Sequence, residues 1–110
     1  MAITTSTKSV LTLNAQTGTT YTLVATDAEK LVTSSNASAI VITIPASIFA
    51  AGEQINVQSI GVGLTTISGA GVTITSTGAS SSAPILRARY SACTIICTAV
   101  NVFTVIGDLS

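Results

Sequence analysis

Apolar and polar residues alternate along most of the chain. The segment 39–44 carries an isoleucine at every second position, and the segment 54–58 alternates aliphatic residues with the amides Gln54, Asn56 and Gln58. Because successive side chains of a strand point to opposite faces, this pattern predicts β-strands with one buried and one exposed face. The enriched residue types are Thr, Val and Ile, whose branched side chains favour strands. The amides of 54–58 are therefore expected to point outward.

The pattern predicts about ten short strands separated by turns. The expected strands are 10–13, 20–25, 30–33, 39–44, 54–58, 64–67, 72–75, 85–90, 93–98 and 102–106. Helix is expected only as single turns at 26–30 and 45–51. Many short strands at close spacing predict an all-β fold, an antiparallel β-sandwich or barrel of jelly-roll or β-tulip type. A flexible N-terminal arm of residues 1–9 is expected to precede a single β domain of residues 10–110.

Two consecutive octapeptides resemble each other. GVGLTTIS (61–68) is followed directly by GAGVTITS (69–76), which predicts two turn-plus-strand units in a meander. A solenoid needs at least three repeats, so two units do not predict one. Phosphate-binding Gly-x-Gly loops are followed by a helix, whereas strands are expected here, so the glycines are interpreted as hairpin turns.

Charge is scarce, which limits the classes of partner. Charged residues make up 7% of the chain and the net charge is +0, against about 25% charged residues in a typical soluble domain. This excludes the electrostatic footprint of a nucleic-acid or acidic-membrane binder. Neither a signal peptide nor a membrane-spanning apolar run is present. Charge-free surface of interface size predicts burial in an assembly, while a monomer with a hydroxyl-coated surface stays open as the alternative.

The two cysteines are expected to be free. Cys93 and Cys97 lie on one face of an expected strand with Ile95. Four strand residues span about 13 Å, whereas a disulfide needs Cα atoms within about 7 Å. Buried free thiols fit synthesis in a reducing cytoplasm. The chain has no histidine, and two thiols alone are too few ligands for a metal, so neither a metal nor another cofactor is expected.

The remaining polar residues do not predict an enzyme. The acids Asp27, Glu29, Glu53 and Asp108 are expected to lie solvated in turns or near the C-terminus. A serine nucleophile would need a histidine or lysine base, and no such signature is present. The absence of tryptophan weakens the case for a sugar-binding module without excluding it.

The stretch LRARYSA (86–92) concentrates positive charge. On an expected strand, Arg87 and Arg89 would point outward, and Leu86, Ala88 and Tyr90 would face the core. Two interpretations stay open: solvated or locally paired arginines, or a contact with a subunit or partner, for which the planar guanidinium is favoured. The candidate interface residues are Lys8, Arg87, Arg89, Gln54, Asn56 and Gln58.

Three segments resemble a module of tailed-bacteriophage virion proteins, found in head-decoration (cement) proteins and at the ends of tail-fibre chains. They are 20–33, 52–76 and 86–110, with the run G-x-Q-I…G-x-G…G-A-G-V-T-I and the ending L-R-A-x-Y-S-A…G-D-L-S as the most specific parts. The chain departs from the module at Phe103, where Trp is expected, and at Cys97, where a basic residue is common. No catalytic residues come with the resemblance.

The resemblance implies an all-β structural unit that is commonly trimeric. The expected function is a capsid decoration protein, made in the host bacterial cytoplasm, that binds the major capsid protein on the virion as a homotrimer. Because the chain starts with Met and holds little beyond the module, a free-standing subunit is expected. The alternative is a tail-fibre tip or receptor-binding module that contacts a host surface glycan through loops such as 76–84. An enzyme acting on host glycans is a third hypothesis that no residue supports, and no nucleic-acid or membrane partner is expected.

Overall fold

The computed structural model describes residues 11–77 and 82–110 of the chain. Within these residues, nine β-strands and one short 3-10 helix form the regular structure, and helix accounts for 3%. The all-β prediction is therefore confirmed. The elements are β1 (Thr12–Gln16), β2 (Thr20–Thr22), η1 (Ala25–Asp27), β3 (Lys30–Ser34), β4 (Ile40–Pro45), β5 (Gln54–Ser59), β6 (Thr65–Ala70), β7 (Thr73–Ser76), β8 (Ala92–Ala99) and β9 (Val102–Gly107).

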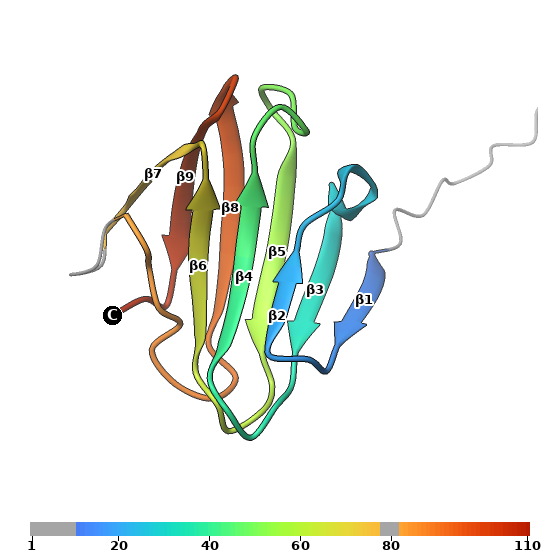
Figure 1. The fold of residues 1–110 in the computed structure, drawn as a ribbon, viewed down its shortest axis with the longest axis vertical. Helices are drawn as coiled ribbons and strands as arrows, with labels where there is room; N and C mark the ends of the chain where they lie inside the picture. Colours follow the sequence, from blue (N-terminus) through green and yellow to red (C-terminus); the bar gives the residue numbers. More distant parts are fainter. Residues whose placement is uncertain (1–10, 78–81) are drawn as a thin grey trace, which may run out of the picture.

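The chain winds back and forth between two sheets as a β-solenoid of about three turns. Strands β1, β3 and β5 lie side by side in one sheet, and β2, β4 and β6 form the other (Figure 1). Neighbours within each set are parallel, as the partners Leu31 and Asn56 of β3 and β5 illustrate. Each of these strands therefore pairs with the strand one solenoid turn away, not with its neighbour in sequence.

The predicted antiparallel sandwich or barrel is wrong. The connections between β1 and β6 are corners that carry the chain to the opposite sheet, so consecutive strands there do not pair. The expected meander of 61–76 is wrong for the same reason, because β6 lies in the three-stranded sheet and β7 in the six-stranded sheet. Alternation specifies which side chains are buried, but it does not specify which strands are neighbours.

A hairpin closes the C-terminal end of the six-stranded sheet. Strand β8 pairs antiparallel with both β5 and β9, and β7 pairs parallel with β9 at the far edge. The segment after residue 83 borders β6, where Ile67 N donates to Pro84 O at 2.8 Å and Leu86 N donates to Thr65 O at 2.9 Å. The expected strand 85–90 is therefore wrong, since only isolated bridges form at its first two residues and a turn follows.

Glycines allow the corners of successive turns to stack closely. A Cβ on Gly61 would meet Asn36 N at 2.5 Å, and a Cβ on Gly63 would overlap the carbonyl of Ser38. The Asn36 side chain also joins adjacent turns, because its Nδ2 donates to Thr17 O at 2.8 Å. These glycines are solenoid corners, and their interpretation as hairpin turns is wrong.

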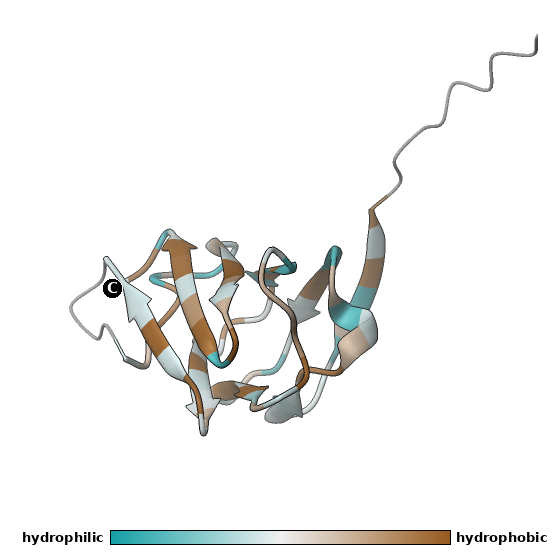
Figure 2. Cartoon of the chain, turned by 90° about the horizontal axis from the view of Figure 1, so that it is seen from above, coloured by the Kyte–Doolittle hydropathy of each residue, from teal (hydrophilic) through white to brown (hydrophobic). Residues whose placement is uncertain are grey.

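The core lies between the two sheets and is mainly aliphatic. Figure 2, the view from above, shows the sheets as two layers whose strands alternate in hydropathy. The rings of Phe49 and Phe103 meet edge to face with centroids 6.1 Å apart. Cys93 and Cys97 are buried and free, as predicted. Burial raises the pKa of Cys93 to about 12, so this thiol is chemically inert.

The two expected helical turns differ in outcome. The turn expected at 26–30 with Thr26 as its cap forms only in part: the 3-10 helix η1 begins one residue earlier, ends at Asp27 and has Val24 as its N-cap. The segment 45–51 is a turn, not a helix, and Ser47 there adopts a φ of 63°.

Candidate partner-binding face

The six-stranded sheet turns one face away from the core, and this face is here called the outer face. The pairing register places alternate residues of each strand on it, opposite the buried positions. Its members are Leu13, Ala15, Leu31, Thr33, Gln54, Asn56, Gln58, Thr73, Thr75, Ala92, Thr94, Ile96, Val102, Thr104 and Ile106.

The outer face carries no charged residue among these positions. The charged residues that the structure describes lie in the short helix η1, in loops or at a strand end, and they are Asp27, Glu29, Lys30, Glu53, Arg87, Arg89 and Asp108. Hydroxyl groups, amides and aliphatic side chains make up the face instead, and Leu13 and Ile106 are exposed to 65% and 46%. Such a surface can be removed from water without stripping a charged group of its hydration.

The β5 amides lie on the outer face, so their predicted outward orientation is confirmed. Gln54 is exposed, and Asn56 and Gln58 are partly buried by neighbouring side chains. Asn56 Oδ1 accepts a hydrogen bond from Thr94 Oγ1 at 2.8 Å, and Gln58 Nε2 donates to Tyr90 O at 3.1 Å. These bonds fix the amide orientations and leave further amide donors and acceptors on the face.

A shallow groove of about 380 Å³ runs over the middle of the outer face. Its lining includes the small residues Ala92 and Gly107 and the aliphatic side chains of Leu31 and Ile106. Gly107 is required here, because a Cβ on it would meet Cys93 Cα at 2.6 Å. The groove can receive an uncharged side chain or backbone segment of a partner, since its lining includes both amides and aliphatic groups.

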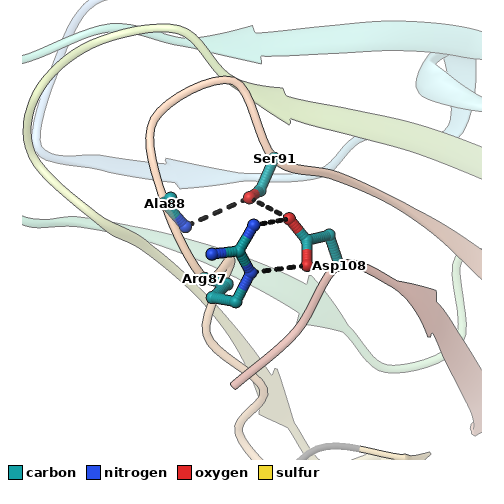
Figure 3. A network of polar contacts seen from close by, with 4 residues as sticks. All are labelled: Arg87, Ala88, Ser91 and Asp108. Carbon is teal, nitrogen blue, oxygen red and sulfur yellow. Dashed lines mark hydrogen bonds and ion pairs between the residues drawn. The ribbon is translucent and has the colours of Figure 1, made fainter.

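The two arginines do not lie side by side on a strand, and each has a local partner. Arg87 forms a bidentate ion pair with Asp108, with Nε–Oδ1 at 2.8 Å and Nη2–Oδ2 at 2.9 Å (Figure 3). Ser91 Oγ donates to Asp108 Oδ2 at 2.6 Å and accepts from Ala88 N at 3.1 Å. The hydrogen bonds of Arg87 and Ser91 hold the pKa of Asp108 below its usual value.

This network joins the two sequence motifs LRARYSA and GDLS. Leu86 forms a bridge with Leu109, and Ser110 N donates to Ile85 O at 2.9 Å. The cluster of Arg87, Asp108 and Ser91 is here called the C-terminal clasp. Local pairing is therefore what the structure shows for Arg87, while a contact with a partner stays a prediction.

Arg89 lies beside an exposed aromatic ring. Its Nε donates to Ile60 O at 3.0 Å, and its guanidinium carbon lies 5.0 Å from the centre of the Tyr90 ring. Tyr90 is exposed to 60% and has a φ of 73°. The expectation that Tyr90 faces the core is wrong, because the chain turns here instead of continuing as a strand.

Asp27 is fully buried, so the expectation of a solvated acid at this position is wrong. Its carboxylate accepts hydrogen bonds from Asn14 Nδ2 at 2.8 Å, Tyr21 OH at 2.6 Å and Val24 N at 3.0 Å. Burial and the bond to Asp27 raise the pKa of Tyr21. Asp27 lies three residues after Val24 and accepts a hydrogen bond from its N–H, a capping spacing that the sequence does contain.

The other acids occupy turns as expected. Glu29 is exposed, and Glu53 Oε1 accepts from Ala50 N at 2.6 Å. Lys8 lies outside the described residues. The part of the chain that the structure describes contains no cluster of three metal-ligating side chains, and no helix there is long and apolar enough to cross a membrane.

Several outer-face residues were not among the sequence candidates. Thr94 and Ala92 of β8 and Ile106 of β9 line the groove together with the predicted amides. Alternation around the cysteines already places Thr94 opposite Cys93 and therefore outward. The sequence did not predict that β5 pairs with β8, and this pairing brings these residues together.

Comparisons with protein-family models, with curated proteins and with solved structures found no match to this chain.

Proposed function

We propose that this protein is a bacteriophage capsid decoration protein that binds the outer head shell as a homotrimer. The observation that carries the proposal is the absence of charge from the outer face of the six-stranded sheet. The choice of a phage capsid as the partner and of a homotrimer as the assembly rests on the resemblance of 20–33, 52–76 and 86–110 to virion modules.

The size of the outer face suits one contact within a multivalent assembly. Six strands spaced about 4.8 Å apart, each about 18 Å long, give a projected area of roughly 450 Å². A standard interface buries about 800 Å² per partner, so the outer face supplies about half of that. A homotrimer presents three such faces, and simultaneous binding strengthens a contact that is weak in a single copy.

The proposed role is mechanical. In this account, each trimer contacts neighbouring copies of the major capsid protein through uncharged surface. The hydroxyl and amide groups of the outer face form hydrogen bonds with the shell while its aliphatic groups leave water. Bridging of neighbouring capsomers then resists the pressure of the packaged DNA.

Quantitative mass spectrometry of purified virions tests this proposal. A decoration protein is present in hundreds of copies per particle, in fixed ratio to the major capsid protein. A few copies per particle would reject the proposal and indicate a tail location.

A second candidate function is a tail-fibre tip that recognises a host surface glycan. The observation that favours it is the exposed Tyr90 ring with Arg89 beside it, since aromatic rings and arginines are common at recognition surfaces. Both residues lie in the turn that precedes β8, where Arg89 Nε donates to Ile60 O and Tyr90 O accepts from Gln58 Nε2. Binding of the purified protein to isolated cell envelopes, abolished by Tyr90→Ala, would support this function. Absence of binding by the unsubstituted protein would reject it.

A further inference from the structure

The first turn of the solenoid ends in two open strand edges. Among the described residues, β1 pairs only with β3 and β2 pairs only with β4. At the other end, β8 covers the edge of β5, and the segment around Pro84 borders β6. The two ends of the solenoid therefore differ: at the first turn both sheets end in an edge strand, β1 and β2, whereas at the other end the six-stranded sheet continues to its edge strand β7 and the segment around Pro84 borders β6.

The backbone of β1 presents hydrogen-bonding groups at its outer edge. Ser35 N donates to Gln16 O at 3.0 Å, so the Gln16 carbonyl points toward β3. Peptide groups alternate in direction along a strand, so those of Leu13 and Ala15 point away from β3. These two residues offer N–H donors and carbonyl acceptors to an added strand.

Strand β1 lacks the charged residues, prolines and bulges that commonly prevent such pairing, whereas β2 is short at three residues. Proteins protect exposed edges with charged residues, prolines or bulges. The sequence of β1, TLNAQ, and that of β2, TYT, contain none of the charged residues or prolines, and their registers with β3 and β4 show no shift. Leu11 and Leu13 are instead exposed to 48% and 65% at this edge.

The interior at this end is already closed by its own side chains. Asn14 Nδ2 donates to Tyr21 OH at 2.9 Å, and both groups bond to the buried Asp27. The contact between Asn14 of β1 and Tyr21 of β2 places the two open edges across the interior from each other. A partner would therefore pair with the backbone groups of the strand edges and would not have to cover an exposed core.

We propose that a second copy of this chain pairs its β1 antiparallel with β1 about a twofold axis at Asn14. Leu13 of one copy then lies opposite Ala15 of the other, and the outward peptide groups of both residues form hydrogen bonds. A second copy fits better than a single extended peptide, because it brings both a β1 edge and a β2 edge to this end. No charge on either strand opposes the pairing of identical edges, and the contact is isologous, as in most dimers.

This pairing does not depend on the proposed function. It joins two subunits through the backbone edge of β1 and does not cover the outer face, on which the side chains of Leu13 and Ala15 remain. In the capsid account, it would link neighbouring trimers in pairs.

Light scattering of the purified full chain tests the pairing through Leu13→Lys. The exposed side chain tolerates the change in the folded subunit, whereas a lysine on each copy beside the twofold axis disrupts the pair. The expected result is that the particle mass halves, whereas the control Val100→Lys leaves it unchanged, because Val100 is 71% exposed in the turn between β8 and β9. A monomeric unsubstituted protein, an unchanged mass in Leu13→Lys, or a threefold fall would each overturn the inference.

Disulfide trapping tests the register. Directly opposed antiparallel residues have Cα atoms about 5.5 Å apart, within the range of a disulfide. A mixture of Leu13→Cys and Ala15→Cys chains should form a cross-linked dimer on mild oxidation, and either variant alone should not. Cross-linking in neither sample, or equally in all, would contradict the proposed register. Binding to phage heads is measured separately on the same samples. If cross-linking occurs but the protein does not bind heads, the capsid proposal is wrong while the β1 pairing stands.

Discussion

At the scale of single residues, Asp27 is the least expected feature of the chain. Its carboxylate is buried, and the three donors that bond to it, from Asn14, Tyr21 and Val24, are neutral. Burying a carboxylate is costly unless it is hydrogen-bonded, and these bonds offset the cost. The network closes the first solenoid turn, where no preceding turn of the described chain covers the interior.

Replacement of Asp27 by alanine should lower the free energy of unfolding by about 3 kcal/mol, because it leaves a cavity at a fully buried position and removes the acceptor of three part-buried hydrogen bonds. Thr26→Ala in the same turn serves as the control, since Thr26 is exposed, and should change stability by less than about 0.5 kcal/mol. Urea unfolding followed by circular dichroism measures both. Equal values for the two variants would show that the network does not stabilise the fold.

The C-terminal clasp makes stability depend on pH in acid. Arg87 and Ser91 lower the pKa of Asp108 in the folded state. The ionised clasp therefore stabilises the fold above the unfolded pKa of about 3.9 and loses this contribution as the pH falls through the lower folded value. Asp108→Asn should be less stable than the unsubstituted chain at about pH 6, and the difference should shrink as the pH falls below about 4. A difference that persists unchanged at low pH would contradict an ionic clasp.

At the scale of elements, the corners determine how the strands are arranged. The glycines between β5 and β6 lie against the backbone of the preceding turn at Asn36 and Ser38. This contact exists only if successive turns stack. In a hairpin at the same position, no preceding turn would lie against the glycine, so a Cβ would fit.

Gly63→Ala should therefore be severely destabilising, by about 3 kcal/mol or more, because its Cβ would overlap the Ser38 carbonyl. Gly18→Ala provides a matched control in another corner, where the nearest backbone atom is 3.6 Å from the Cβ position. It should change stability by about 1 kcal/mol or less. Thermal unfolding of the two variants compares them directly, and similar melting temperatures would argue against stacked turns.

Alternation predicted the faces of the strands better than their partners. The segment 54–58 and the strand around Cys93 have the predicted orientations, because burial of one face produces the period-two pattern. Pairing was predicted wrongly, because a corner and a hairpin turn use the same residue types, glycine above all. The segment 85–90 shows a further limit, since its alternation continues through Tyr90, where the backbone turns at a φ of 73°. The outer-face site could therefore be predicted only on β5, and its extension to β8 needed the fold.

At the scale of the whole molecule, the fold separates charge from the sheet surfaces. Described charges lie in loops, at strand ends or, for Asp27, inside the first turn. The six-stranded sheet therefore presents a broad uncharged face, while one end of the solenoid presents open edges. A molecule of this kind can meet a shell through one surface and a second copy through another.

The most direct test of this account is the binding of the purified protein to phage heads assembled without it. Ala92 is exposed in the groove of the outer face, and Ala92→Lys places a charge there without disturbing the core. Val100→Lys adds the same charge beyond the other end of β8. Burying an unpaired charge costs several kcal/mol, so Ala92→Lys should weaken saturation binding at least tenfold while Val100→Lys binds as the unsubstituted protein does. Equal binding by all three proteins would contradict the claim that the uncharged face meets the partner.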